Sequence, residues 1–71
     1  MVEMIQNKVH ERRTAAGLTQ EEFAQKIGVT RQTVISIEKG NYTPSVLLAL
    51  KIAAQFNCVV EDIFTIVCTK K

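Results

Sequence analysis

Four side chains able to donate or accept hydrogen bonds recur at helical spacing near the middle of the chain. They are Arg31, Gln32, Ser36 and Lys39. At about 100° per residue, these positions and Ile35 fall within about 140° of one helix face. Arg can hold guanine O6 and N7 through two hydrogen bonds, Gln can do the same at adenine N6 and N7, and Ser can bond to several bases. This face therefore has the chemistry needed to read base edges in a major groove.

Ile35 is the apolar member of that face. A contact with a thymine methyl group would explain it, and so would ordinary exposure of an apolar side chain. On the opposite side of the segment, Val34 and Ile37 form an apolar seam. The seam predicts that one side of a helix over 31–39 packs on the domain while the polar side faces outward.

The preceding residues predict a second helix that crosses the first. Phe23, Ala24 and Ile27 share a narrow face, and Ala24 is small enough for another helix to approach closely. Gly28 follows at the turn. Two short helices joined by a tight glycine-containing turn indicate a helix-turn-helix.

Start and stop signals divide the chain into five expected helices and a tail. Helices are expected over about 5–16, 20–27, 31–39, 44–56 and 60–64. Thr19, Thr30 and Thr43 are the expected N-caps, with Glu22 completing a capping box and Pro44 in a first turn. Because the loops are short, neighbouring helices must pack together. We expect a compact all-α, lambda-repressor-like domain over 1–71, with its core over 5–64 and a possible C-terminal β-strand.

Length, composition and charge exclude several classes of protein. A chain of 71 residues and 8.0 kDa is one small domain. It offers no nucleophile–base pair, metal cluster or phosphate-cradling glycine loop, so we expect no enzyme, cofactor or metal. It has no apolar run long enough for a membrane span and no secretory signal, so we expect a cytoplasmic protein. The net charge of +2 permits a polyanionic partner without requiring one.

Four stretches carry a resemblance to a known family: GLTQEEFA at 17–24, GVTRQTV at 28–34, IEKG at 37–40 and PS at 44–45. Residues 7–64 resemble the Cro/CI-type helix-turn-helix family, the xenobiotic-response-element-like group of phage and bacterial repressors. The resemblance implies a five-helix domain whose third helix enters the major groove of double-stranded DNA, often from a homodimer.

The resemblance also implies roles for individual residues. Base reading is expected from Gln20, Arg31, Gln32, Ile35 and Ser36. Contacts with DNA phosphates are expected from Thr19, Thr30, Thr33, Lys39, Asn41 and Tyr42. Glu38 lies at the edge of the apolar seam, where a charge needs a partner. The family places an Arg–Glu salt bridge between the first and third helices at the matching positions, which implies a structural pair between Arg13 and Glu38.

The segment 65–71 has the β-branched, roughly alternating character of a strand. Phe64, Ile66 and Cys68 would share one face. A lone strand would leave its backbone unpaired, and pairing with the same strand of a second copy would solve that. We therefore expect a dimer interface at Ile63, Phe64, Ile66 and Cys68. The alternative is a disordered tail lying on 60–64. Cys58 is expected to fill the core, and a reducing cytosol argues against a disulfide at Cys68.

Two functions from different classes follow. The first is a sequence-specific DNA-binding transcriptional regulator, a repressor, acting as a homodimer. The second is a protein-interaction module, such as the antitoxin of a toxin–antitoxin pair, because a fold does not fix its function. The sequence shows no small-molecule effector site.

Overall fold

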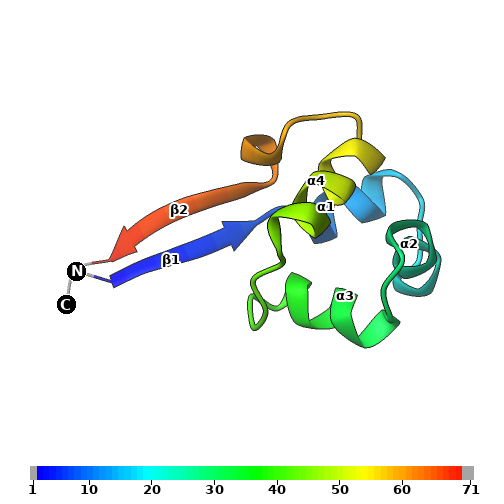
Figure 1. Ribbon diagram of the computed structural model, residues 1–71, viewed down its shortest axis with the longest axis horizontal. Coiled ribbons are helices and arrows are strands. Elements are labelled where there is room, and N and C mark those ends of the chain that lie inside the picture. Colours follow the sequence, from blue (N-terminus) through cyan, green and yellow to red (C-terminus); the bar gives the residue numbers. More distant parts are fainter. Residues whose placement is uncertain (1, 70–71) are drawn as a thin grey trace.

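The computed structural model describes residues 2–69, which form two strands, four α-helices and one 3₁₀ turn. In chain order they are β1 (Val2–Asn7), α1 (Val9–Ala15), α2 (Gln20–Ile27), α3 (Arg31–Glu38), α4 (Val46–Gln55), the 3₁₀ turn (Val60–Asp62) and β2 (Phe64–Thr69). The four helices form a body from which the two strands project as a ribbon (Figure 1). The molecule is therefore elongated, with extents of 38 × 23 × 22 Å.

The two strands pair with each other in antiparallel register, with Glu3 opposite Cys68 and Ile5 opposite Ile66. The C-terminal strand is confirmed over Phe64–Thr69, and positions 70–71 of the expected tail lie outside the described residues. The expectation that a helix begins near Ile5 is wrong, because these residues belong to β1. The premise that β2 lacks a partner within the chain is also wrong. The pairing joins residues about 60 positions apart, so no local sequence pattern could reveal it.

The N-terminal ends of α2 and α3 match the sequence expectations. Thr19 Oγ1 accepts a hydrogen bond from the backbone N–H of Glu22 at 3.0 Å, and Glu22 Oε1 accepts one from the Thr19 N–H at 2.8 Å. Thr30 Oγ1 accepts a bond from the Thr33 N–H at 3.3 Å. Between the helices, Gly28 has a φ of 76°, a left-handed conformation that glycine adopts without the steric cost of a Cβ. Both caps and the turn are therefore encoded locally.

The last two expected helices need correction. Helix α4 begins after Ser45, not after Thr43, because Ser45 Oγ accepts the Leu48 N–H at 3.1 Å and serves as the N-cap. The expected helix over 60–64 is a single 3₁₀ turn, so residues 2–69 contain four α-helices and not five. Val59 offers no capping oxygen. The Asp62 carboxylate instead accepts the Val59 N–H at 3.3 Å, and the chain enters β2 two residues later.

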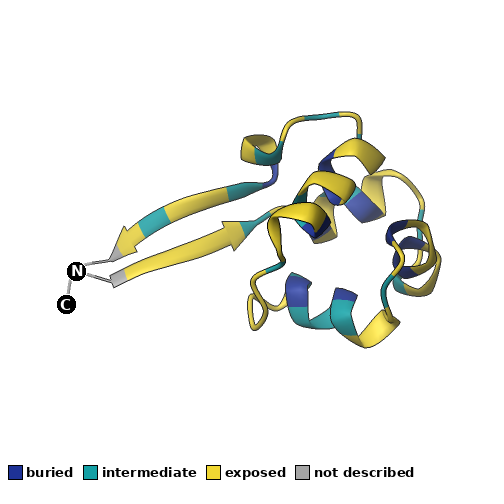
Figure 2. Ribbon diagram, in the orientation of Figure 1, coloured by how far each residue is buried: buried dark blue, intermediate teal, exposed yellow. Residues whose placement is uncertain are grey.

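The core lies where α1–α4 meet the end of the 3₁₀ turn (Figure 2). Its buried apolar residues are Val9, Phe23, Ala24, Ile27, Val34, Ile37, Leu48, Ile52, Ala53 and Ile63. Phe23 stacks on the partly buried Phe56, with ring centroids 5.1 Å apart. Cys58 also packs against this cluster, as expected. None of the helices described in residues 2–69 has the length and apolar character needed to span a membrane.

Candidate nucleic-acid interface

Helices α2 and α3 form a rigid pair that presents one face of α3. Ala24 is 1% exposed, and its carbonyl accepts the Val29 N–H at 3.0 Å, which closes the turn between the helices. Val34 and Ile37 on the inner side of α3 are fully buried. With its inner side fixed in the core, α3 has little freedom to rotate, so its outer side chains have defined positions.

The outer face of α3 is polar and positively charged at both ends. Arg31 and Gln32 are exposed at its first turn, and Lys39 is exposed where the helix ends. Ile35 and Ser36 lie between them and are partly exposed. The structure thus brings the base-reading candidates of α3 onto one accessible surface. Ile35 is half-buried on that surface, so both explanations of it remain compatible with its position.

The threonines expected at DNA phosphates also hold helix ends. Thr19 and Thr30 are the N-caps of α2 and α3, and each accepts a backbone hydrogen bond. The hydroxyl oxygens of Thr30 and Thr33 lie 3.1 Å apart. A capping hydroxyl keeps its own O–H available as a donor. Thr19 can therefore cap α2 and donate to a phosphate oxygen at the same time, and of Thr30 and Thr33 the one that accepts from the other keeps its proton for a phosphate.

The segment after α3 exposes the other expected phosphate contacts. Gly40 has a φ of 80°, and the Asn41 N–H donates to the carbonyl of Ser36 at 2.9 Å. The chain turns away from the helix at this point. Asn41 and Tyr42 are exposed, beside the exposed Lys39. This turn continues the accessible surface of α3 beyond its C-terminal end.

A polar cluster centred on Glu38 joins the first three helices. Arg13 Nε donates to Glu38 Oε2 at 2.6 Å, and Arg13 Nη2 lies 3.3 Å from Oε1. The two side chains are 9% and 7% exposed. Arg13 Nη1 also donates to the Leu18 carbonyl at 2.8 Å. The ion pair implied by the resemblance is therefore formed, and it ties α1 to α3 beside the core.

Glu38 Oε1 accepts further contacts. Gln20 Nε2 donates to it at 3.3 Å, and His10 Nδ1 lies 3.3 Å away. Burial raises the pKa of Glu38, but the hydrogen bonds from Arg13, Gln20 and His10 and the charge of Arg13 outweigh burial and hold that pKa below its usual value of 4.5. The carboxylate is therefore ionised at neutral pH and acts only as an acceptor.

Two members of this region lie outside every sequence motif. His10 is exposed, yet its ring contacts both Glu38 and Arg13. Asn7 Nδ2 donates to the Ile37 carbonyl at 2.9 Å, and Asn7 Oδ1 accepts the Val9 N–H at 3.1 Å. An Asn just before a helical pattern is a known start signal and could have placed the beginning of α1.

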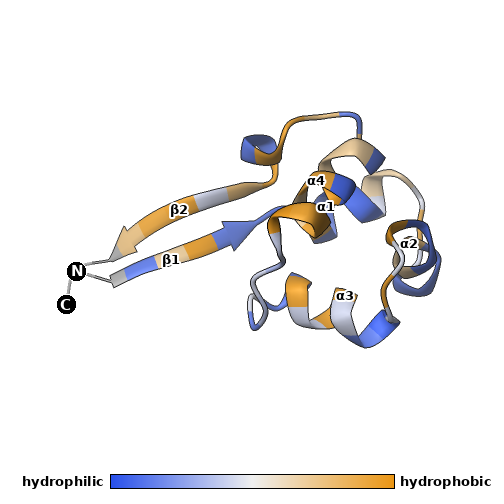
Figure 3. Cartoon of the chain, in the orientation of Figure 1, coloured by the Kyte–Doolittle hydropathy of each residue, from blue (hydrophilic) through white to orange (hydrophobic). Residues whose placement is uncertain are grey.

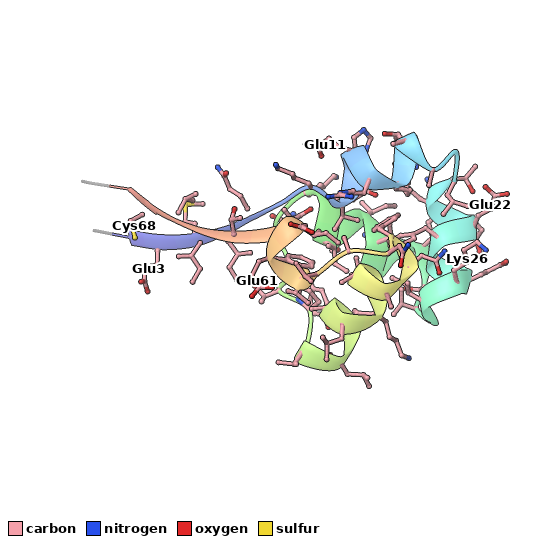
Figure 4. The ribbon with its side chains drawn as sticks, turned by 90° about the horizontal axis from the view of Figure 1, so that it is seen from above. Glu3, Glu11, Glu22, Lys26, Glu61 and Cys68 are labelled. Atoms are coloured by element: carbon pink, nitrogen blue, oxygen red, sulfur yellow. The ribbon has the colours of Figure 1, made fainter. Side chains whose placement is uncertain are left out.

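Of the residues expected at a dimer interface, one lies in the core and three lie on β2 of the ribbon. Ile63 is 1% exposed in the core of its own chain, so it does not offer its side chain to a partner. Phe64 is partly buried at the base of the ribbon, while Ile66 is 70% exposed. Cys68 is a free, exposed thiol opposite Glu3, and both lie near the far end of the ribbon (Figure 4).

Within residues 2–69, no group of three or more His, Cys, Asp and Glu side chains is arranged to hold a metal ion.

Comparisons with known proteins place the chain in a family. A family model described as "Helix-turn-helix" matches residues 9–63. An HTH-type transcriptional regulator of Bacillus subtilis (strain 168), YgzD, is 53% identical over 60 residues, which cover 84% of this chain and 91% of that protein. A second such regulator, MJ0272 of Methanocaldococcus jannaschii, is 53% identical over 60 residues, again covering 84% of this chain and 91% of its own length.

Two solved structures resemble this fold. The restriction-modification controller protein C.AhdI from Aeromonas hydrophila has a TM-score of 0.70 and 33% identity, covering 76% of this chain and 82% of that one. The clp gene regulator ClgR from Corynebacterium glutamicum has the same TM-score with 22% identity, over 76% of this chain and 57% of that one, and supports the fold alone. The chain belongs to the Cro/CI-type helix-turn-helix family of transcriptional regulators.

Proposed function

We propose that this protein binds duplex DNA sequence-specifically by inserting α3 into the major groove, and that it represses transcription by occupying promoter DNA. The observation that carries the proposal is the division of α3 into two sides. Val34 and Ile37 are fully buried, while Arg31, Gln32 and Lys39 are exposed. A helix of this shape and charge suits a major groove, whereas a protein-docking helix would expose apolar residues.

The cationic ends of α3 support binding to the DNA backbone as well. Lys39, Asn41 and Tyr42 continue the same surface, and Thr19, Thr30 and Thr33 can donate to phosphates from the other end. Phosphate contacts would fix the register of the protein, and Arg31, Gln32 and Ser36 would read bases. Each phosphate neutralised releases counterions, so affinity should fall steeply as salt rises.

The ribbon supports a homodimer. Ile5 lies opposite Ile66 and Met4 opposite Val67, and because successive residues of a strand point to opposite faces, both faces of the ribbon carry an apolar pair. Both strands include apolar stretches (Figure 3). Met4, Ile5 and Ile66 are 53%, 43% and 70% exposed. A two-stranded ribbon without a covering layer is at best marginally stable in water. Pairing of β2 with β2 of a second copy about a two-fold axis would extend the sheet to four strands, satisfy the free backbone edge of β2 and bring Ile66 beside the second copy.

Selection from a random duplex library, read by sequencing at moderate salt, tests the proposal. We expect an enriched palindrome with half-sites about 10 base pairs apart, centre to centre. Enrichment of a single half-site would retain DNA reading and contradict the homodimer. No enrichment would contradict the proposed function and redirect attention to a protein partner. The curated relatives are named transcriptional regulators, which favours DNA over a role as an antitoxin module.

A further inference from the structure

The side-chain amide of Gln20 donates a hydrogen bond to the carboxylate of Glu38, whose side chain is almost fully buried. Gln20 is the first residue of α2 and is half-buried, at the edge of the proposed DNA interface. Its Nε2 donates to Glu38 Oε1 at 3.3 Å. The same oxygen lies near Arg13 Nη2 and His10 Nδ1, and the other carboxylate oxygen is engaged by Arg13 Nε at 2.6 Å. The position of Glu38 is therefore held by Arg13 and His10 as well as by Gln20.

The charge state of Glu38 determines the orientation of the Gln20 side-chain amide, that is, whether its Nε2 or its Oε1 faces Glu38. The two ends of a glutamine amide have almost the same shape, and only hydrogen bonding distinguishes them. An ionised carboxylate has no proton to give, so it can bond to Nε2 and not to Oε1. The pKa of Glu38 lies below its usual value, so the carboxylate stays ionised at neutral pH. The Gln20 carbonyl oxygen must then be directed away from Glu38.

Arg13 allows this carboxylate to lie near DNA. An acidic side chain close to a phosphate backbone would repel it, but the Arg13 guanidinium neutralises Glu38 at hydrogen-bond distance. The Glu38 side chain is only 7% exposed, so it does not itself reach into the groove. It can act on DNA only through a side chain that it touches, and Gln20 is the one of its partners that lies on the helix-turn-helix surface.

We propose that Glu38 is a positioning residue for DNA recognition, which sets the Gln20 amide with its carbonyl oxygen toward the groove and so favours a base with an amino group. This inference rests on the proposed function. In the major groove, only adenine N6 and cytosine N4 donate hydrogen bonds, whereas guanine and thymine present acceptors. A Gln20 carbonyl oxygen fixed in this orientation therefore accepts a hydrogen bond from adenine or cytosine and finds no donor on guanine or thymine. The second Nε2 hydrogen stays available for a phosphate oxygen.

Glu38→Gln tests whether the charge of Glu38, and not only the volume of its side chain, orients the Gln20 amide. A Gln at 38 keeps the shape but can donate as well as accept, so the Gln20 amide can turn round and offer either end. Library selection with wild type should enrich adenine or cytosine at one position of each half-site, and Gln20→Met should abolish that preference. In Glu38→Gln the preference at that same position should fall about tenfold, with the remaining positions unchanged. The double variant should lose no more than Gln20→Met alone.

Ile52→Val is the control that lowers the stability of the fold without changing a residue of the proposed interface. It alters the core at a fully buried position of α4, a helix that contributes no residue to the proposed interface. Its base preferences should equal those of wild type, so loss of stability alone is not the cause of a relaxed position. An unchanged preference in Glu38→Gln, or an effect that adds fully to that of Gln20→Met, would overturn the positioning role while leaving DNA reading intact.

A measurement without DNA distinguishes the two proposals. The Gln20 side-chain amide gives a pair of proton–nitrogen resonances, which Gln20→Met identifies by their absence. In wild type these should differ from those of a solvated glutamine, and in Glu38→Gln they should shift toward solvated values. Unshifted resonances would overturn the contact. If they shift as expected but wild type enriches no DNA sequence, the proposed function fails, and the role in recognition fails with it.

Discussion

Replacing Glu38 with Gln tests the ion pair that joins α1 to α3. Removing one member of a buried pair costs about 3–5 kcal/mol in many proteins, because the other charge is left without compensation. The Arg13 side chain is 9% exposed and bonds to both carboxylate oxygens. A Gln at 38 can still accept one of these bonds, and a single hydrogen bond to a charged group is worth about 1.5–3 kcal/mol. We therefore expect the free energy of unfolding to fall by about 2 kcal/mol.

This loss is large for so small a protein. At about 0.05–0.15 kcal/mol per residue, 71 residues have a total stability of about 4–11 kcal/mol. For a domain of this size, 1 kcal/mol shifts the melting temperature by about 4–8 °C, so Glu38→Gln should lower it by about 8–16 °C. Circular dichroism melts at neutral pH measure the shift. Glu11→Gln, an exposed position on α1, is the matched control and should change stability by no more than about 0.5 kcal/mol.

The same variant has a characteristic pH dependence. The pKa of Glu38 is lowered in the folded state, so the unfolded chain takes up the proton first as pH falls. The stabilisation is complete above the unfolded pKa of about 4.5 and is lost as pH falls through the lower folded pKa. Wild type should therefore approach Glu38→Gln in stability as the pH falls below about 4. Because His10 also contacts Oε1, the series is repeated in a His10→Asn background. Equal stability of the two proteins at neutral pH, or a difference that stays constant into acid, would refute the role of the ion pair.

The other predictions concern the capping box, the reading face, the crossing of the helices and the ribbon. Thr19→Ala should cost about 1 kcal/mol in denaturant titrations, because the Glu22 N–H loses its acceptor. Gln32→Ala should cost about 1–3 kcal/mol on the best site and relax one base pair, and equal loss on all sequences would mark a backbone contact instead. Ala24→Leu should overpack the crossing of α2 and α3 and cost about 1–3 kcal/mol. Ile66→Lys should make the protein monomeric in sedimentation, with Thr65→Lys as the control, and a persistent dimer would contradict pairing through the ribbon.

The helix-turn-helix could be predicted from sequence because each of its signals is local. Thr19 with Glu22, Gly28 and Thr30 fix the ends of α2 and α3 within a few residues, and the structure places all of them as expected. The apolar spacing of Val34 and Ile37 sets which side of α3 is buried. Every piece of this information lies within one or two helical turns of the backbone that it determines.

The ribbon could not be predicted in the same way. Ile5 reads as the beginning of a helix, because its apolar spacing to Val9 also fits a helix. The strand conformation of β1 depends on β2, whose residues are about 60 positions away, and on the bond from the Lys8 N–H to the Ile63 carbonyl at 2.9 Å. Short apolar segments are ambiguous between helix and strand until their partner is known.

Only one of the side-chain partners of Glu38 could be predicted from the sequence, because the others also depend on how distant segments pack. The resemblance identified Arg13 as its partner, but it described a pair, whereas the structure forms a cluster that also contains Gln20 and His10. Those side chains come from three helices and meet only after the helices have packed. A residue that sequence places in a structural role can therefore also touch the interface. For this reason base preference and stability must be measured on the same Glu38 variant, since either one alone would assign it a single role.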